Sequence, residues 1–365
     1  MIKIIYTINF LTNGGPTRVL ENLIKNLDKN YYEIIVITLI NENEMEVVEK
    51  IRSQGVRIVE LNYKKKLIDI LADRNQIIGQ INGYHPDVIH THGIVSTMIV
   101  SSKKLKCRKI STIHNSIFED YKYTYGRYKG ILFAYIHIAL LKRFYKVICC
   151  SKTSYEVIRK YLSQATYIRN GIDIEDRKES NNIRGDIRKQ LGIDKNATIY
   201  IYAGKLCVRK RVSQLVNMFD GNMADDEYLL IAGDGQIRES LEHSVRDSHI
   251  IFLGFKSNIA NYFRASDVYV SYSFSEGFSV AIIEALECGL LLLLSDIPSH
   301  KECFEMDSNY YIGEIFEETD FVSKKRTIKN RVGDIDNKRA SKEFKERYLS
   351  SHVMTDQYLK YYEVK

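Results

Sequence analysis

The sequence predicts an α/β protein that contains two doubly wound parallel sheets. Its 365 residues exceed what one hydrophobic core usually supports, which favours two domains. Short apolar runs alternate with segments of helical composition in both halves of the chain, a pattern typical of βαβ units. The apolar character within each run is continuous, as expected for parallel strands covered on both faces.

Eleven apolar runs are predicted to form the strands of these sheets. In the first half they are residues 2–8, 33–39, 56–61, 88–91, 109–114 and 147–150, and in the second half residues 198–203, 228–232, 250–253, 268–271 and 290–295.

The domain boundary is predicted at Asn170-Gly171. Asn-Gly marks a turn, and the segment after it is polar and charged, as in a linker. We therefore expect one domain of residues 1–170 and a second of residues 171–344, with Asn170 and Gly171 as the hinge.

The composition is that of a soluble globular protein, with 45% hydrophobic and 27% charged residues. None of the six cysteines forms a Cys-x-x-Cys pair, so we expect reduced thiols and a cytoplasmic location. The first residues are too short an apolar run for a secretory leader, and no run reaches the roughly 20 residues of a membrane-spanning helix.

Positive charge is concentrated in the first half of the chain. Residues 1–170 contain 26 Lys and Arg against 14 Asp and Glu, a balance of +12. Residues 121–149 interleave Tyr, Ile and Leu with Lys and Arg, which suits a helix lying on an anionic membrane surface. The same composition also fits a buried helix with a basic rim. Because the excess is confined to one half and no DNA- or RNA-binding motif is present, we expect no nucleic-acid partner.

Two glutamates eight positions apart, Glu276 and Glu284, form the most informative motif. A buried strand is predicted at residues 268–271, then a turn, then a helix from Val280. Free amides at a helix start attract anions. Two carboxylates beside an anion site suit a ligand with both phosphates and hydroxyls, such as a nucleotide-sugar. On spacing alone, the alternative is that Glu276 caps the helix and Glu284 is solvated.

Two further loops follow predicted strands. Gly14-Gly15 comes after the first strand and indicates either a phosphate-facing loop at a helix start or a plain turn. Lys205 and Lys210 belong to a cationic run after Gly204, where a diphosphate would lie; a solvated charged face is the alternative. Charge-assisted hydrogen bonds of this kind contribute about 1.5–3 kcal/mol each.

Histidines end two of the predicted strands, His92 after the fourth and His114 after the fifth. They lack Asp, Glu, His or Cys neighbours at ligand spacing, so we expect no metal site and no cofactor. We favour His114 as a polar group at the reaction centre, the alternative being a structural histidine.

The order of these motifs resembles that of the family 4 glycosyltransferases, which have the GT-B architecture. This resemblance implies two Rossmann-like domains facing each other across a cleft, with a C-terminal helix of about residues 345–365 that returns to the first domain. It also implies transfer with retention of anomeric configuration and no required metal. The motifs that carry it are Gly14 to Arg18, His90 to Gly93, Thr112 to His114, Asn170 to Asp173, Gly204 to Leu206 with Lys210, Gly233 to Gly235, Phe252 to Phe255, Glu276 to Ala285, and Ser295 to Glu302.

The resemblance further implies the roles of individual residues. Lysines would hold the diphosphate, Glu284 the ribose hydroxyls and Glu276 the donor sugar. The implied catalytic residues are His114, Glu276, Lys205 and Lys210; the implied donor-binding residues are Gly14, Gly15, Lys205, Lys210, Phe255, Glu276, Gly277, Phe278, Ser279, Val280 and Glu284; and the implied acceptor-side residues are Thr17, Arg18, His92 and Asn115.

The chain departs from the family pattern at three positions. Lys205 stands where the family usually has arginine, and lysine cannot hold a phosphate in bidentate fashion. Ser279 replaces a smaller Gly or a Pro beside the sugar site, and Leu291 replaces a common proline. These departures leave the donor sugar open.

We therefore expect a retaining hexosyltransferase that uses a nucleotide-diphosphate sugar, expected to be UDP-linked. Its acceptor would be a glycan or a polyprenyl-linked glycan in bacterial capsule or exopolysaccharide synthesis, at the inner face of the cell membrane. No residue is an obvious covalent nucleophile, which favours attack on the same face as departure. Two alternatives remain: a nucleotide-sugar 2-epimerase of the same fold, and a non-catalytic partner subunit of a transferase.

Overall fold

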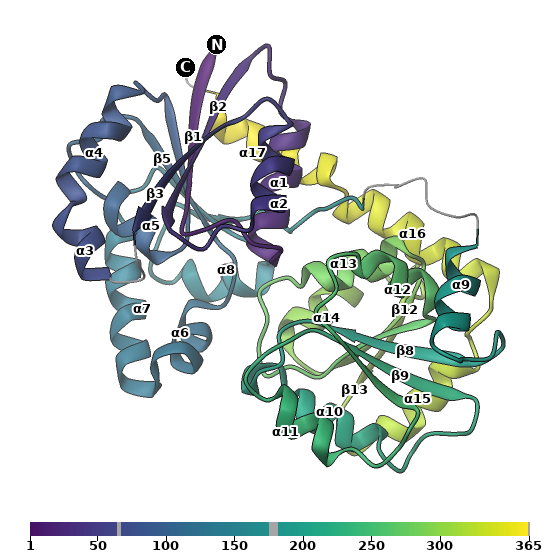
Figure 1. Ribbon diagram of the computed structural model, residues 1–365. Coiled ribbons are helices and arrows are strands. Elements are labelled where there is room, and N and C mark those ends of the chain that lie inside the picture. Colours follow the sequence, from purple (N-terminus) through teal and green to yellow (C-terminus); the bar gives the residue numbers. More distant parts are fainter. Residues whose placement is uncertain (64–66, 175–181, 364–365) are drawn as a thin grey trace. The chain divides into compact units, whose positions relative to one another are not determined.

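The structure is a computed structural model that describes residues 1–63, 67–174 and 182–363. It consists of two compact units (Figure 1). The first comprises Met1–Gly171 and Ser351–Lys365, and the second comprises Ile172–Ser350.

The first unit contains a seven-stranded parallel sheet in the order β3-β2-β1-β4-β5-β6-β7. Because the strand order reverses between β1 and β4, the loops after these two strands diverge and leave room for a ligand. The strands are β1 (Ile2–Ile8), β2 (Tyr32–Ile40), β3 (Arg57–Tyr63), β4 (Val88–His92), β5 (Arg108–Ile113), β6 (Lys146–Cys149) and β7 (Ala165–Tyr167). The helices are α1 (Gly15–Asn26), α2 (Met45–Arg52), α3 (Leu67–Ala72), α4 (Arg74–Gly83), α5 (Ile94–Val100), α6 (Ile117–Tyr125), α7 (Arg127–Leu141), α8 (Lys152–Ile158) and α17 (Ser351–Tyr362).

The second unit contains a six-stranded parallel sheet in the order β10-β9-β8-β11-β12-β13, which reverses between β8 and β11. The strands are β8 (Thr198–Ala203), β9 (Glu227–Ala232), β10 (Ile250–Gly254), β11 (Val268–Ser271), β12 (Leu291–Ser295) and β13 (Gly313–Phe316). The helices are α9 (Ile183–Gln190), α10 (Val212–Phe219), α11 (Arg238–Ser244), α12 (Ile259–Ala265), α13 (Val280–Glu287), α14 (Pro298–Phe304), α15 (Phe321–Lys329) and α16 (Ile335–Leu349), with a 3₁₀ turn at Val208–Lys210.

The prediction of two doubly wound, Rossmann-like sheets is confirmed. All eleven predicted strands are present with bounds within two residues, and the sequence missed β7 and β13. The C-terminal helix predicted at about residues 345–365 is observed as the end of α16 followed by a separate helix, α17. The two are divided at Ser350, where the backbone is extended.

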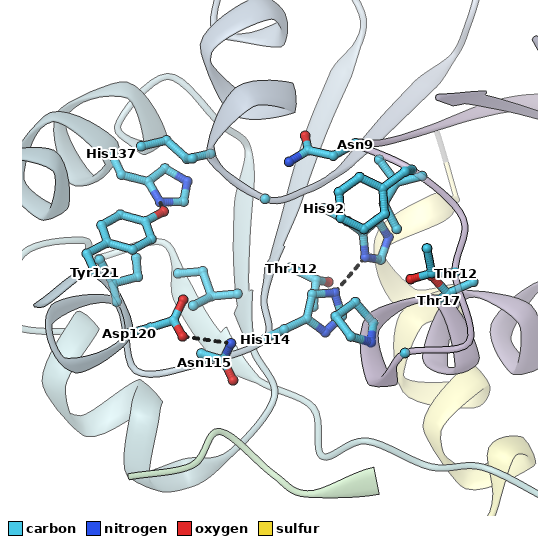
Figure 2. A pocket seen from close by; sticks show the side chains of 18 of the residues that line it. Asn9, Thr12, Thr17, His92, Thr112, His114, Asn115, Asp120, Tyr121 and His137 are labelled. Carbon is cyan, nitrogen blue, oxygen red and sulfur yellow. Dashed lines mark hydrogen bonds between the residues drawn. The ribbon is translucent and has the colours of Figure 1, made fainter. Parts of the chain in front are cut away.

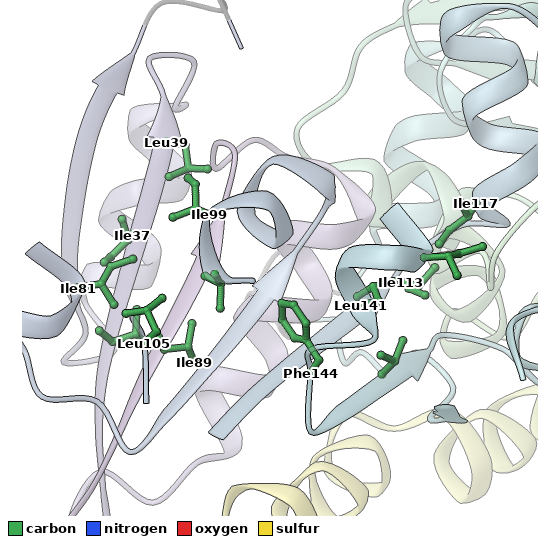
Figure 3. Packing of buried hydrophobic residues seen from close by; sticks show 14 of the residues in the cluster. Ile37, Leu39, Ile81, Ile89, Ile99, Leu105, Ile113, Ile117, Leu141 and Phe144 are labelled. Carbon is green, nitrogen blue, oxygen red and sulfur yellow. The ribbon is translucent and has the colours of Figure 1, made fainter. Parts of the chain in front are cut away.

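Each sheet has its own hydrophobic core, built from the continuous apolar runs that predicted the strands. In the first unit β-branched side chains dominate, as expected for central strands. Figure 3 shows part of this cluster, in which Ile37, Leu39 and Ile89 lie on strands and Ile81 and Ile99 on helices. The core of the second unit is richer in aromatic rings, including Tyr200, Phe219, Phe316 and Phe321.

The last helix, α17, is bound to the first sheet by buried hydroxyl and imidazole groups. Tyr6 Oη donates to Tyr362 Oη at 3.0 Å, and Tyr362 Oη lies 2.7 Å from His90 Nδ1. His90 Nε2 lies 2.7 Å from Thr112 Oγ1, which lies 3.0 Å from Tyr358 Oη. Burial lowers the pKa of His90 to about 3, so the neutral imidazole links the Tyr362 and Thr112 hydroxyls with one donor and one acceptor nitrogen. The network therefore joins α17 to β4 and β5 through uncharged groups.

Within the described part of the chain, none of the helices combines the length and the apolar character that crossing a bilayer requires.

Candidate functional site

The first unit contains a cavity of about 280 Å³ at the carboxyl ends of β1, β4 and β5 (Figure 2). Its position at the reversal of strand order is where open α/β sheets bind ligands. Five predicted residues line it: Gly14 and Thr17 at the start of α1, His92 at the end of β4, and His114 and Asn115 after β5.

Two other predicted residues of this loop lie beside the cavity without lining it. Gly15 is the first residue of α1, whose N-terminus is set by the extended Gly14 and by proline in the first turn. Arg18 Nε donates to Asn13 Oδ1 at 3.1 Å, so this guanidinium supports the loop between β1 and α1.

A pair of neutral histidines forms one side of the cavity. His92 Nδ1 lies 2.7 Å from His114 Nε2, and the two rings stack with centroids 5.0 Å apart. Burial lowers the pKa of His92 far below its usual range and that of His114 to about 4. At neutral pH these imidazoles act as hydrogen-bonding groups and not as cations. Among the described residues, no group of three or more His, Cys, Asp or Glu is placed to bind a metal ion.

The opposite side of the cavity is formed by Asp120, Tyr121 and His137, which sequence reasoning did not assign to a site, together with the predicted Asn115. Tyr121 Oη lies 2.7 Å from His137 Nδ1, and Asn115 Nδ2 donates to Asp120 Oδ1 at 3.3 Å (Figure 2). Gly130 allows α7 to approach α6 this closely, because a Cβ there would lie 2.5 Å from the Tyr121 carbonyl oxygen. Only this helix contact, and no sequence spacing, brings Tyr121 and His137 together.

Glu276 is the centre of a charged cluster in the second unit. Its Oε1 accepts hydrogen bonds from Lys210 Nζ at 2.5 Å and from Ser273 Oγ at 2.7 Å, and Arg209 Nη1 lies 3.6 Å from Oε2. Burial alone would raise the pKa of Glu276, but the two cations and the two hydrogen bonds outweigh it and lower the pKa to about 2. Glu276 is therefore a carboxylate at any physiological pH, although its side chain is buried.

The cluster lies where the strand order of the second sheet reverses. Lys210 belongs to the loop after β8, and Glu276 to the loop after the neighbouring strand β11. The two loops are joined by a backbone hydrogen bond, from Phe274 N to Arg209 O at 3.0 Å, and by the Arg209 side chain, whose Nη1 donates to Ser275 O at 2.7 Å. Arg209 belongs to the same cationic run after Gly204 as Lys205 and Lys210, but nothing in the sequence indicated that it fixes the loop carrying Glu276.

The alternative interpretation, in which Glu276 caps the helix and Glu284 is solvated, is wrong. The N-cap of α13 is Ser279, while the Glu276 carboxylate is engaged by Lys210 and Ser273. Glu284 lies one turn inside α13 and is only 5% exposed.

The remaining predicted donor residues surround the start of α13 or follow neighbouring strands. Gly277 and Phe278 are buried, and Val280 is the first residue of α13. Lys205 and Phe255 are exposed in the loops after β8 and β10, with Phe255 56% exposed. Asn170 and Gly171 end the first unit, with Asn170 buried and the Gly171 amide 3.2 Å from Met354 Sδ on α17.

His300 is a further buried group; it belongs to the motif Ser295 to Glu302, but the sequence analysis assigned it no role. Its Nδ1 lies 3.1 Å from Ser295 Oγ, which accepts a hydrogen bond from the Ser273 amide at 3.1 Å. Burial lowers the pKa of His300 to about 4, so it is neutral beside the charged cluster. It supports the loop that carries Glu276.

Glycosyltransferase families match the sequence, and its relatives include named glycosyltransferases. The family described as glycosyltransferase family 4 matches residues 13–176, and the family described as glycosyl transferases group 1 matches residues 183–344. The O-antigen biosynthesis glycosyltransferase WclY of Escherichia coli is 26% identical over 314 residues, covering 83% of each chain. An E. coli UDP-Gal:α-D-GlcNAc-diphosphoundecaprenol α-1,3-galactosyltransferase is 24% identical over 255 residues, covering 65% of each chain.

Solved structures show the same fold over the whole chain. Anabaena HepE, determined in complex with UDP and glucose, superimposes with a TM-score of 0.80 at 15% identity and covers 99% of both chains. The lipopolysaccharide glycosyltransferase WaaG superimposes with a TM-score of 0.70 at 12% identity, covering 97% of this chain and 95% of that one. With two glycosyltransferase families matching successive parts of the sequence and GT-B enzymes sharing its fold, the chain belongs to the family 4-like glycosyltransferases.

Proposed function

We propose that this glycosyltransferase moves a hexose from a UDP-sugar to a glycan or polyprenyl-linked acceptor in bacterial surface polysaccharide synthesis, with retention of configuration and without a metal ion. The observation that carries the proposal is the cluster of Glu276, Lys210 and Arg209 beside the N-terminus of α13. It combines a permanent carboxylate for sugar hydroxyls with two cations for phosphate.

The cluster suits departure of a diphosphate. Negative charge builds up on the leaving phosphate as the sugar–phosphate bond breaks, so fixed cations and helix amides stabilise the transition state more than the ground state. A lysine ammonium carries three donors, and the bond to Glu276 uses one of them. On this proposal Lys210 and Lys205 bind the diphosphate. The two lysines stabilise its negative charge, as a metal ion does in other transferases.

The other donor contacts follow from the same placement. Glu276, with the amides of Gly277, Phe278 and Ser279, would orient the sugar, and the buried Glu284 would accept from the ribose hydroxyls. Phe255 would border the base, and Val280 would contribute the first turn of α13. From the first unit, His114 and the Gly14-Gly15 loop would contact the donor, and Thr17, Arg18, His92 and Asn115 would serve the acceptor side.

The relatives favour the UDP-linked donor and the lipid-linked acceptor. HepE was solved with UDP and glucose, and the E. coli galactosyltransferase uses UDP-Gal on a diphosphoundecaprenol-linked sugar. The reaction class is tested by incubating the enzyme with a panel of nucleotide-sugars, with and without an acceptor extract, and measuring nucleotide release and the anomeric configuration of the product.

The Glu276→Gln variant should lose roughly 100-fold or more in turnover, as expected when one positioned transition-state contact is removed. Glu343→Gln, at an exposed position of α16, is the matched control and should retain activity. Equal turnover in both variants would contradict the assigned site. Epimerised donor formed without acceptor would instead support the 2-epimerase, and nucleotide binding without turnover of any donor would support a non-catalytic subunit.

We also propose that α7 holds the enzyme at the cytoplasmic face of an anionic membrane. Residues 121–149 do not form one helix: they comprise the end of α6, α7 and β6. One face of α7 is buried in the unit, and the other presents a continuous apolar stripe spaced at helical intervals. The stripe consists of Tyr128 (85% exposed), Ile131, Leu132 (60%), Tyr135 and Ile136, and the exposed cations at its ends are Arg127, Lys129, Lys142 and Arg143.

Exposed apolar side chains with a basic border are typical of helices that lie in a bilayer interface. In flotation with vesicles of phosphatidylglycerol and phosphatidylcholine, the wild-type protein should bind in a salt-sensitive way, and the double variant Tyr128→Ser/Leu132→Ser should not. Ile335→Ser, which removes an equally exposed apolar residue from α16, should float like the wild type. Flotation of the double variant at the wild-type level would remove α7 as the anchor.

A further inference from the structure

Arg211 has a backbone conformation that is unfavourable for a residue with a Cβ atom. Of the non-glycine residues that the structure describes, three have positive φ, and Arg211 is the one in the second unit, with φ 49° and ψ 35°. In this left-handed region the Cβ lies too close to a carbonyl oxygen, which costs free energy. Such a conformation persists only where surrounding contacts stabilise it, and it is frequent at functional sites.

The contacts of Arg211 are made by the flat face of its guanidinium. The guanidinium carbon lies 3.8 Å from the centroid of the Tyr272 ring and 4.6 Å from that of the Phe274 ring. Among the described residues Nε has no hydrogen-bond partner, and Nη2 lies 3.8 Å from the exposed Glu318 carboxylate, beyond hydrogen-bond distance. Attraction between the cation and the two aromatic faces therefore offsets the cost of the backbone conformation.

The two rings differ in how they are held in the second unit. Tyr272 is buried and stacks on Phe316 in the hydrophobic core, with ring centroids 5.3 Å apart, whereas 45% of Phe274 is exposed. Both belong to the loop after β11. Arg211 therefore connects a ring that is fixed in the core to a ring at the surface of the same loop.

The residue between these rings holds the Glu276 carboxylate. Ser273 lies between Tyr272 and Phe274 in the sequence, and its Oγ donates to Glu276 Oε1 at 2.7 Å. Any movement of the two rings relative to each other would displace the Ser273 hydroxyl. The stacking of Arg211 on both rings therefore fixes the segment from which this hydrogen bond is made.

Three consecutive cations of the loop after β8 thus hold the loop after β11. Arg209 donates to the Ser275 carbonyl oxygen, and Lys210 donates to Glu276 Oε1. Arg211 contacts the same loop through its aromatic rings. The first two use hydrogen bonds and the third uses its flat face, so the three contacts restrain different parts of the loop.

We propose that Arg211 is a positioning residue for sugar transfer, because its stacking on the two rings holds the loop in which Ser273 fixes Glu276. The inference rests on the proposed function, since it takes Glu276 as the group that orients the donor sugar. On this proposal Arg211 acts through Glu276 and leaves the two phosphate-binding lysines in place. Its loss should therefore slow the chemical step more than it weakens donor binding.

The experiment replaces Arg211 by glycine and by alanine in the full-length protein. Both changes remove the stacking group, but only glycine also relieves the left-handed strain. The melting temperature of Arg211→Gly should therefore lie within about 4 °C of the wild type, and that of Arg211→Ala should be lower. Turnover is measured as UDP release from UDP-glucose, UDP-galactose and UDP-N-acetylglucosamine with an acceptor extract. It should fall about tenfold or more, and equally in both variants, while the KM for the donor stays within about twofold.

Arg331→Gly is the matched control, because Arg331 also stacks on a tyrosine of the second unit, with its guanidinium carbon 4.2 Å from the Tyr311 ring centroid. Tyr311 precedes β13 and so lies at the opposite edge of the sheet from Glu276. This variant should turn over the donor like the wild type. Wild-type turnover in Arg211→Gly would overturn the proposal, and so would a loss that follows the melting temperature and is much larger in the alanine variant.

Hydrogen exchange gives a second readout that needs no substrate. The amides of Ser273 and Phe274 are both hydrogen-bonded and report on the loop after β11. In Arg211→Gly they should exchange about tenfold faster than in the wild type, and in Arg331→Gly at the wild-type rate. Unchanged exchange in Arg211→Gly would overturn the proposal. Faster exchange in a protein that turns over none of the donors, or whose Glu276→Gln variant keeps full turnover, would refute the proposed function but support the hold of Arg211 on the loop.

Discussion

Replacing Glu276 by glutamine should destabilise the second unit by an amount that the structure predicts. The pKa of this carboxyl falls from an ordinary 4.5 to about 2, because Lys210, Arg209 and Ser273 outweigh the effect of burial. A difference of about 2.5 pKa units corresponds to about 3 kcal/mol of folding free energy at neutral pH. Glutamine keeps the size of the side chain but leaves two cations without their counter-ion, so about 3 kcal/mol should be lost.

The pH dependence of this loss gives a second check. Because the folded-state pKa is depressed, Glu276 contributes its full stabilisation above about pH 4.5 and loses it as the pH falls toward 2. The difference in free energy of unfolding between the wild type and Glu276→Gln should therefore be largest at pH 7 and shrink steadily below pH 4.5.

The measurement is urea unfolding followed by far-ultraviolet circular dichroism at a series of pH values, since the chain contains no tryptophan. Glu343→Gln removes an equivalent charge from the exposed pair with Arg339, at 2.6 Å, and should cost less than about 1 kcal/mol. A loss in Glu276→Gln no larger than in this control, or one that persists unchanged at acid pH, would refute the electrostatic account.

Two further predictions concern the fold. Tyr362→Phe removes the hydroxyl that lies 2.7 Å from His90 Nδ1. It should lower the free energy of unfolding, measured by urea unfolding, by about 1–3 kcal/mol. An unchanged free energy of unfolding would show that the buried network contributes nothing to stability. Gly233→Ala places a Cβ 1.9 Å from the Gly204 carbonyl oxygen and should lower the melting temperature. The control is Gly221→Ala, where the backbone is also left-handed but the space is open, and its melting temperature should fall much less. Equal effects would show that the close approach is unimportant.

The strands were predictable because their apolar runs are continuous. The two that were missed, β7 and β13, are the terminal strands of their sheets, three and four residues long, and most of their residues are only partly buried. An edge strand pairs on one side only and does not need a fully apolar sequence, so neither residues 165–167 nor residues 313–316 stand out from the surrounding chain.

The charged cluster of the second unit was predictable for a topological reason. Residues that follow neighbouring parallel strands must meet at the same edge of the sheet, so Lys210 after β8 and Glu276 after β11 come together as soon as β8 and β11 are adjacent. No such rule of sheet topology applies to Tyr121 and His137. They are 16 residues apart on two helices, and their contact depends on how α6 packs against α7.

The arrangement of β4 and β5 links the C-terminal helix to the cavity. Side chains two positions apart on a strand share a face of the sheet, so His90 and His92 lie on one face of β4. Thr112 lies on β5, and His114 follows directly after the end of that strand. The first residue of each pair belongs to the network that holds α17, and the second forms the histidine pair of the cavity.

The two pairs are also in direct contact, since the rings of His90 and His92 lie 4.5 Å apart. The hydroxyls of Tyr358 and Tyr362 thus fix the strand face on which the neutral histidine pair rests, although α17 is separated from these strands by more than two hundred residues of sequence. A helix that lines no part of the cavity is in this way a structural requirement for its geometry.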